Sequence, residues 1–374
     1  MVTLSVNHSH QSKPSRRCCT FRKIKKLGTL ATQLIAALVY LSNYTFNHRR
    51  VQKYNAHKLK IMIDSPEEMI AIDKKGGTIH FVDPDTFVIR STLSDFPPVP
   101  HELTISPDRK EAYVPIYGPG IYGSNPNPGH LIAVIDLVAR QHRGYIDINP
   151  YRGPHTMKFG PDGLLYSCAE ASGVVVIIDI RSREVIGAID ARSVGCHRLV
   201  ITPDGTRLFT ENEDADPWAS VIDLKKREFS LRLPTPNGAA GIDLSPGGEL
   251  LVISDGKVPD LVVFDAIECT QITRISLSGH QCPAQIVRFS PDGKWLIVTN
   301  MDGNVATIIE NPPYGRQHLV PTGKSPMDMA FHPNGQTVVI GNQGDGTLSV
   351  IDLPSKQESE RPKVGVGVEA LGFF

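Results

Sequence analysis

Short runs of apolar residues, each followed by a single acid, recur along the chain at a nearly constant interval. The runs end at Asp83, Asp136, Asp179, Asp223, Asp265, Glu310 and Asp352. Neighbouring acids in this series are 53, 43, 44, 42, 45 and 42 residues apart. Many of the apolar residues are β-branched and turn-forming residues separate the runs, so each interval is expected to hold several short strands. A repeat of this length is typical of one four-stranded blade, and the pattern predicts an all-β, seven-bladed β-propeller.

A second motif recurs in phase with the first: a proline followed by Asp-Gly, Asn-Gly or a close variant. Its prolines are Pro107, Pro161, Pro203, Pro246, Pro291 and Pro333. Proline sets φ of the first turn position and the glycine accepts a left-handed backbone, so each copy predicts a tight turn between two strands. The strand after the turn is apolar and often ends in Asn or Asp, as in residues 296–300. These motifs resemble the YVTN-type propeller repeats, and the resemblance covers the chain from about residue 66 to its end.

The last apolar stretch of the chain fits the same frame. Glu369 lies 42 residues after Met327, which stands six residues before a turn proline. We therefore expect residues 366–374 to form the innermost strand of the blade whose outer strands come from residues 66–90. The alternative is that residues 58–63 supply this strand.

The first 65 residues do not follow the repeat. The predicted organisation is a basic tail at 1–26, a transmembrane signal anchor at 27–46, a linker at 47–65 and the propeller at 66–374. Residues 30–41 are uncharged, follow a cluster of Arg and Lys, and lie in a stretch of the roughly 20 residues that span a bilayer. A cleaved signal peptide and an amphipathic helix on the membrane surface remain alternatives. The positive charge before the span favours a single-pass protein with an extracytoplasmic propeller.

Charge and cysteine content narrow the classes of function. Lys and Arg together number 39, as do Asp and Glu, and no basic stripe with interleaved aromatic residues runs through the repeats, so nucleic acid is not an expected partner. Cys168, Cys196, Cys269 and Cys282 belong to different repeats and lack a metal-ligand spacing such as Cys-x-x-Cys. We expect buried thiols rather than a disulfide or a metal site at these positions.

Histidine occupies one equivalent position in three successive repeats. His101, His155 and His197 each stand six residues before a turn proline, and Glu369 takes the same position in the C-terminal strand. These positions begin the innermost strands, which meet at one mouth of a propeller channel. We therefore predict that these four residues bind zinc or another divalent transition metal. The alternative is that the imidazoles line a wet channel and hydrogen-bond to water.

An acid-rich segment, residues 211–218, is expected at the same mouth. Glu213 in this segment is predicted to act with His155 and His197 as a general acid or base on a small-molecule substrate.

Pro154-His155 and Glu213 also resemble the seven-bladed lactonase branch of propellers, which includes phosphogluconolactonases and carboxymuconate-lactonising enzymes. The resemblance implies an enzyme that performs lactone hydrolysis, cyclisation or isomerisation. The strand-start arginine of that branch is replaced here by His197, and a later one falls near Lys257 or Met301. Without these arginines, phosphogluconolactone and other anionic substrates are disfavoured. The alternative is a non-catalytic, membrane-tethered propeller that binds a ligand or a protein. A haem-bearing propeller is disfavoured because the chain has no Cys-x-x-Cys-His motif.

Overall fold

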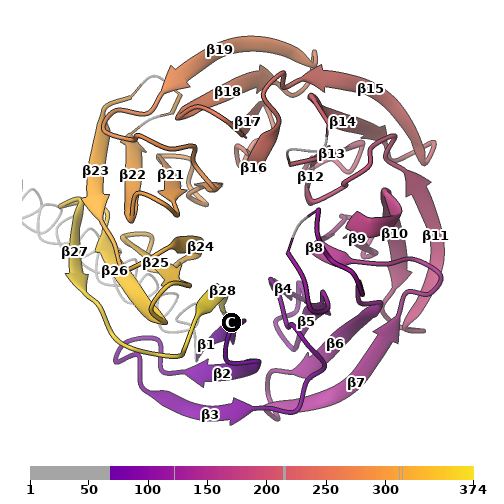
Figure 1. Cartoon of the computed structure of the whole chain (residues 1–374), viewed down its shortest axis with the longest axis horizontal. Helices are drawn as coiled ribbons and strands as arrows, with labels where there is room; N and C mark the ends of the chain where they lie inside the picture. The colour runs from indigo at the N-terminus through magenta and orange to yellow at the C-terminus, as the bar shows by residue number, and fades with distance from the viewer. Residues whose placement is uncertain (1–67, 122, 214–215, 311, 314) are drawn as a thin grey trace, which may run out of the picture. The chain divides into compact units, whose positions relative to one another are not determined.

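Seven antiparallel sheets of four strands each are arranged around a central axis in the computed structural model (Figure 1). The structure describes residues 68–374, apart from 122, 214–215, 311 and 314. The predicted all-β, seven-bladed propeller is therefore confirmed.

The strands of the first three blades follow a common order, from the innermost strand outward. The first blade contains β28 (Val368–Phe373), β1 (Met69–Asp73), β2 (Thr78–Val82) and β3 (Ile89–Leu93). The second contains β4 (Thr104–Ile105), β5 (Glu111–Ile116), β6 (Leu131–Asp136) and β7 (Gln141–Asp147). The third contains β8 (Pro154–Phe159), β9 (Leu165–Ala169), the 3-10 helix η1 (Glu170–Ser172), β10 (Val174–Asp179) and β11 (Glu184–Asp190).

The remaining four blades repeat this order. The fourth contains β12 (Arg198–Ile201), β13 (Arg207–Glu211), β14 (Trp218–Asp223) and β15 (Glu228–Pro234). The fifth contains β16 (Ala239–Leu244), β17 (Leu250–Asp255), β18 (Asp260–Asp265) and β19 (Thr270–Ser276). The sixth contains β20 (Ile286–Phe289), β21 (Trp295–Asn300), β22 (Val305–Glu310) and β23 (Gln317–Pro321). The seventh contains β24 (Pro326–Phe331), β25 (Thr337–Asn342), β26 (Thr347–Asp352) and β27 (Gln357–Glu360).

The two repeated motifs form turns on the same face of the propeller. The repeated acid ends the third strand of a blade and caps the turn that follows. Oδ1 of Asp136 accepts a hydrogen bond of 2.7 Å from the N–H of Ala139, and Oδ1 of Asp223 accepts one of 3.0 Å from Lys226. The Pro-Asp-Gly motif joins the first and second strands, and its glycines adopt left-handed backbones, as at Gly163 with a φ of 80°. We call this side of the propeller the turn face.

The ring closes through the C-terminal strand, as predicted. β28 pairs with β1 in an antiparallel register that sets Met69 opposite Phe373. The closing segment is also held by Asp73, whose two carboxylate oxygens accept hydrogen bonds of 2.7 Å from the N–H groups of Val366 and Gly367. The alternative, in which residues 58–63 supply the innermost strand, is wrong because β28 occupies that place.

The predicted segments at 1–26, 27–46 and 47–65 lie outside the described residues. Among residues 68–374, with the gaps given above, no helix is both long enough and apolar enough to cross a bilayer.

Candidate functional site

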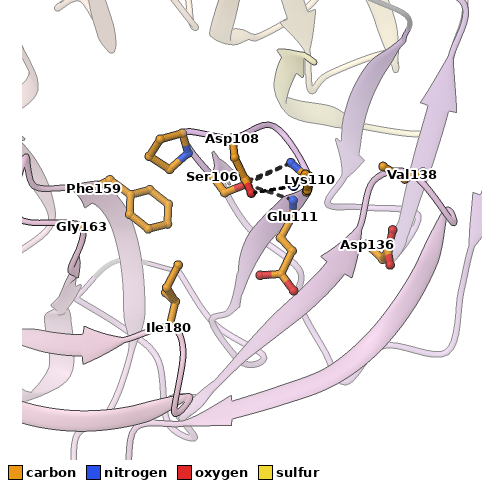
Figure 2. Close-up of a pocket in the computed structure, with 10 residues that line it drawn as sticks. Ser106, Asp108, Lys110, Glu111, Asp136, Val138, Phe159, Gly163 and Ile180 are labelled. Carbon is orange, nitrogen blue, oxygen red and sulfur yellow. Dashed lines mark hydrogen bonds and ion pairs between the residues drawn. The ribbon is translucent and has the colours of Figure 1, made fainter.

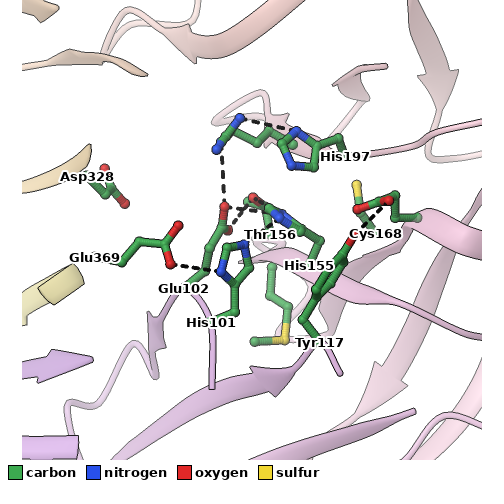
Figure 3. Close-up of polar contacts among 12 residues, drawn as sticks. His101, Glu102, Tyr117, His155, Thr156, Cys168, His197, Asp328 and Glu369 are labelled. Carbon is green, nitrogen blue, oxygen red and sulfur yellow. Dashed lines mark hydrogen bonds and ion pairs between the residues drawn. The ribbon is translucent and has the colours of Figure 1, made fainter. Parts of the chain in front are cut away.

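Three histidines converge at the ends of neighbouring innermost strands, on the side opposite the turn face. His155 is the second residue of β8, His197 directly precedes β12, and His101 lies three residues before β4. Their exposed fractions are 4% for His101, 2% for His155 and 3% for His197. Nε2 of His101 lies 2.6 Å from Nε2 of His155, and the ring centroids of His155 and His197 are 3.9 Å apart (Figure 3). Chain topology therefore gathers the three sequence-predicted histidines at one place.

Each of the three imidazoles places its Nδ1 against a carboxylate. The Nδ1-to-oxygen contacts are His101 with Glu369 at 2.9 Å, His155 with Glu102 at 3.2 Å and His197 with Glu211 at 2.9 Å. A carboxylate that accepts the Nδ1 proton orients the ring and leaves the lone pair on Nε2. In His101 and His155 these Nε2 lone pairs then face each other at 2.6 Å. Two such lone pairs repel unless a cation, either a proton or a metal ion, lies between them.

His197 has the most crowded environment of the three. Its Nδ1 also lies 3.0 Å from Oε2 of Glu213 and 3.1 Å from Nη1 of Arg198. Glu213 has a left-handed backbone, with a φ of 41°, and its side chain is 18% exposed. The structure therefore pairs the predicted acid-base residue Glu213 with His197, whereas His155 is paired with Glu102.

Two groups of side chains in the described residues are spaced closely enough to hold a metal ion. They are His101 with Glu102 and His155, and His155 with Glu170 and His197. Glu369 instead contacts Nδ1 of His101 and receives a hydrogen bond of 3.2 Å from Nζ of Lys74. Glu369 thus orients His101 in this structure, and metal binding by the four predicted residues stays a prediction.

The sequence pattern did not single out two residues of this site, Glu102 and Tyr117. Tyr117 directly follows β5, and its hydroxyl donates a hydrogen bond of 2.8 Å to Oε1 of Glu170. The other oxygen of Glu170, Oε2, is buried and has no hydrogen-bond partner among the described residues. Their positions in the repeat could have identified them. Tyr117 and Glu170 both come directly after the second strand of their blades, and Glu102 adjoins His101.

Burial sets the protonation states of the site. It lowers the pKa of His101 to about 4 and that of His197 well below its ordinary value, so both imidazoles are neutral near pH 7. Burial raises the pKa of Glu211 to about 8, so this carboxyl is largely protonated near pH 7, and the ionised carboxylates that accept an Nδ1 proton are those of Glu369 and Glu102, whose pKa values are lowered. Burial would also raise the pKa of Glu369, but the charges of His101 and Lys74 outweigh it and bring that pKa to about 2. Neutral imidazoles are the form that binds metal ions.

A separate hollow of about 590 Å³ lies on the turn face, between the second and third blades (Figure 2). Its lining includes Ser106, Asp108, Phe159 and Ile180. The polar groups of Ser106 and Asp108 are engaged by their own turn, for example through a hydrogen bond of 2.7 Å between them.

Comparisons with known proteins agree with the fold. The family model described as WD domain, G-beta repeat matches residues 271–306 and 317–352, each from an outermost strand into the next blade. The periplasmic gluconolactonase PpgL of Pseudomonas aeruginosa is 20% identical, with a TM-score of 0.66, over 81% of this chain and 98% of that chain. Hydrazine synthase of Kuenenia stuttgartiensis is 21% identical, with a TM-score of 0.62, over 76% of this chain and 92% of that chain. No curated protein matches the sequence significantly. Likeness at this level of identity shows the fold alone.

Proposed function

We propose that this propeller is a metal-dependent enzyme that acts on a small, weakly charged organic molecule, with lactone hydrolysis as the favoured reaction and cyclisation or isomerisation as related ones. The observation that carries the proposal is the cluster of three buried imidazoles, in which Nε2 of His101 lies 2.6 Å from Nε2 of His155. Two nitrogens on one tetrahedral zinc-type ion, with bonds of about 2.0–2.1 Å, lie about 3.3 Å apart, so the two rings would move apart by several tenths of an ångström when an ion binds.

The chain offers two ligand sets for such an ion, His101 with Glu102 and His155, and His155 with Glu170 and His197. In the second set Glu170 would supply Oε2, the oxygen that has no hydrogen-bond partner among the described residues. When bound, a zinc-type ion polarises a carbonyl and lowers the pKa of water.

The other charged groups would position these ligands and exchange protons. Glu102 and Glu369 orient His155 and His101, while Glu213 and His197 form the acid-base pair nearest the exposed edge of the site. Proton transfer needs such a pair within hydrogen-bond reach of each other.

A weakly charged substrate fits the balance of charge. Both cations near the histidines are already paired, Arg198 with Glu102 and Glu211, and Lys74 with Glu369. An anionic substrate would therefore compete with carboxylates that already neutralise these cations. The structural likeness to a gluconolactonase adds support for a lactone as the substrate class.

Metal analysis tests the proposal directly. Purified full-length protein would be stripped with a chelator, titrated with Zn²⁺ or Co²⁺, and assayed for hydrolysis of uncharged aliphatic lactones. We expect about one metal ion per chain and metal-dependent turnover. His155→Gln should abolish both, because both metal-capable groups contain His155. His130→Gln is the matched control, since His130 pairs with Asp147 away from the cluster.

The same assay separates the alternatives. If wild-type protein binds neither Zn²⁺ nor Co²⁺, the metal site is refuted. The short contact between His101 and His155 would then be explained by a shared proton. Metal binding without turnover of any lactone would favour a non-catalytic binding propeller.

We also propose that residues 27–46 tether the chain to a membrane as a single-pass anchor, with an extracytoplasmic propeller. Support comes from the uncharged run at 30–41 and the basic residues before it. Assignment of the repeats to the YVTN type is likewise a proposal, supported by the six Pro-Asp-Gly-type turns.

A further inference from the structure

Two buried cysteines from neighbouring blades lie side by side behind the histidine cluster. Sγ of Cys168, in β9, is 3.0 Å from Sγ of Cys196, which lies in the segment that enters β12. Both residues are free thiols with 0% exposure. Non-bonded heavy atoms normally stay about 3.5–4.0 Å apart, and a disulfide bond is about 2 Å long, so the sulfurs lie between contact and bond distance.

The surroundings leave the two thiols facing one another. Oγ1 of Thr210 lies 3.2 Å from the sulfur of Cys196 and 3.6 Å from that of Cys168. The rest of the local core is apolar and includes Tyr166 and Leu199. Within this core, each sulfur is therefore the nearest reactive partner of the other.

We propose that Cys168 and Cys196 form a disulfide that links the third and fourth blades when the chain folds in the presence of a small disulfide such as oxidised glutathione. The Cys196 sulfur attacks the disulfide of the oxidant, forms a mixed disulfide and releases one oxidant thiol. The Cys168 sulfur then attacks Cys196, forms the protein disulfide and releases the second oxidant thiol. The two protons of the protein thiols pass to the oxidant sulfurs, and the oxidant is reduced by two electrons.

The disulfide would fix the distance between the third and fourth blades at the candidate site. Cys196 adjoins His197, and Cys168 lies two residues before Glu170. A covalent link at this point would hold together the two blades that supply these residues. The inference rests on the two thiols and their packing, so it holds or fails independently of the proposed enzymatic function.

Oxidative refolding followed by peptide mapping tests the disulfide. Full-length protein would be reduced and unfolded, then refolded in detergent with reduced glutathione alone or with a mixture of oxidised and reduced glutathione. The protein would next be denatured and its free thiols blocked with N-ethylmaleimide. Refolding is needed because glutathione cannot reach side chains with 0% exposure in the folded protein.

We expect the tryptic peptides 159–181 and 193–198 to be linked in the oxidised sample alone. Peptides 258–274 and 275–288, which carry Cys269 and Cys282, serve as internal controls and should be alkylated in both samples. The oxidised protein should melt about 5 °C higher, because a disulfide that closes a loop of this length restricts the unfolded chain.

Two variants separate the bond from general effects of oxidation. Cys168→Ser should abolish the redox-dependent rise in Tm, while Cys282→Ser should retain it. Equal alkylation of Cys168, Cys196, Cys269 and Cys282 in the oxidised wild-type sample would overturn the inference, and this peptide map does not depend on whether a variant folds. Linkage of Cys168 to any other cysteine would overturn it as well.

Discussion

At the scale of single residues, burial and ion pairing set the protonation states of the side chains in the site. An exposed histidine titrates near pH 6.5, but burial lowers the pKa of His101 to about 4. The carboxylate of Glu369 remains ionised because its pKa is about 2, despite the burial that would raise it. A neutral imidazole beside an ionised carboxylate is the pair that commonly orients histidine ligands toward a metal ion.

Glu369→Gln should weaken metal binding while the protein stays folded. The amide still contacts Nδ1 of His101 but removes the negative charge that makes the imidazole a stronger ligand, so the Kd for Zn²⁺ should rise about 10- to 100-fold. Competition with a chromophoric chelator measures this change. Glu228→Gln is the control, because Glu228 has a 60% exposed side chain and should leave the Kd unaltered. An unchanged Kd for Glu369→Gln would exclude an orienting role for Glu369.

At the scale of elements, the histidines meet because each lies at or near the start of an innermost strand. The turn prolines fix the phase of these strands, and the strand pairing then sets which residues reach the mouth opposite the turn face. The closing strand β28 matters twice, since it completes the first blade and carries Glu369 into the site. Asp73 joins the end of β1 to the segment that leads into β28.

Asp73→Asn should destabilise this closure in a pH-dependent way. Burial raises the pKa of Asp73, but the neighbouring His80 and hydrogen bonds from the N–H groups of Val366, Gly367 and Gly76 outweigh it and lower the pKa from 3.8 to about 2. A lowered carboxyl pKa stabilises the fold above pH 3.8, and this stabilisation is lost as pH falls from 3.8 toward 2. The variant should therefore lose about 2 kcal/mol at pH 7.

Urea denaturation at pH 7 and at successively lower pH would measure this difference between Asp73→Asn and wild type. The difference should shrink as pH falls below 3.8. Asp302→Asn, a change at an exposed position, should stay within about 0.5 kcal/mol of wild type. A difference that is constant with pH would show that Asp73 does not act through its charge.

At the scale of the whole molecule, the chain combines a propeller with an N-terminal region of different character. Residues 65–374 form one compact unit, whose described part closes on itself through β28 and β1. Each blade keeps only one short outer edge, as in the outermost strand β3. The composition of residues 27–46, which lie outside the described residues, predicts a membrane anchor. The ring of blades closes without this segment.

Full-length protein should remain with membranes after an alkaline carbonate wash, because a single-pass helix is held by the bilayer core rather than by charge. A chain that begins at residue 65 should appear in the soluble fraction. Recovery of both proteins in the soluble fraction would contradict the anchor. Release of the full-length chain by high salt alone would instead favour an amphipathic surface helix.

The architecture of the propeller follows from local patterns in the sequence. The repeated acids and Pro-Asp-Gly turns act through hydrogen bonds within a few residues, such as that from Ala139 to Asp136, so a local pattern suffices to predict them. Seven copies of the acid-ended run, at a nearly constant interval, predicted seven blades. The same frame placed His101, His155, His197 and Glu369 at equivalent positions, and the ring closure through residues 366–374 followed from it.

The pairing of side chains in the site depends on how the chain packs in three dimensions. Glu102 lies against His155, Glu213 lies against His197, and Cys168 lies against Cys196. A repeat specifies the strand and the depth of a residue, but these contacts depend on the twist between blades, on side-chain rotamers and on left-handed backbones such as that of Glu102, with a φ of 57°. The Glu102–His155 and Cys168–Cys196 contacts leave no periodic trace in a single sequence, because they form only when neighbouring blades pack together. The Glu213–His197 contact lies within the fourth blade and forms through the pairing of β12 with β13.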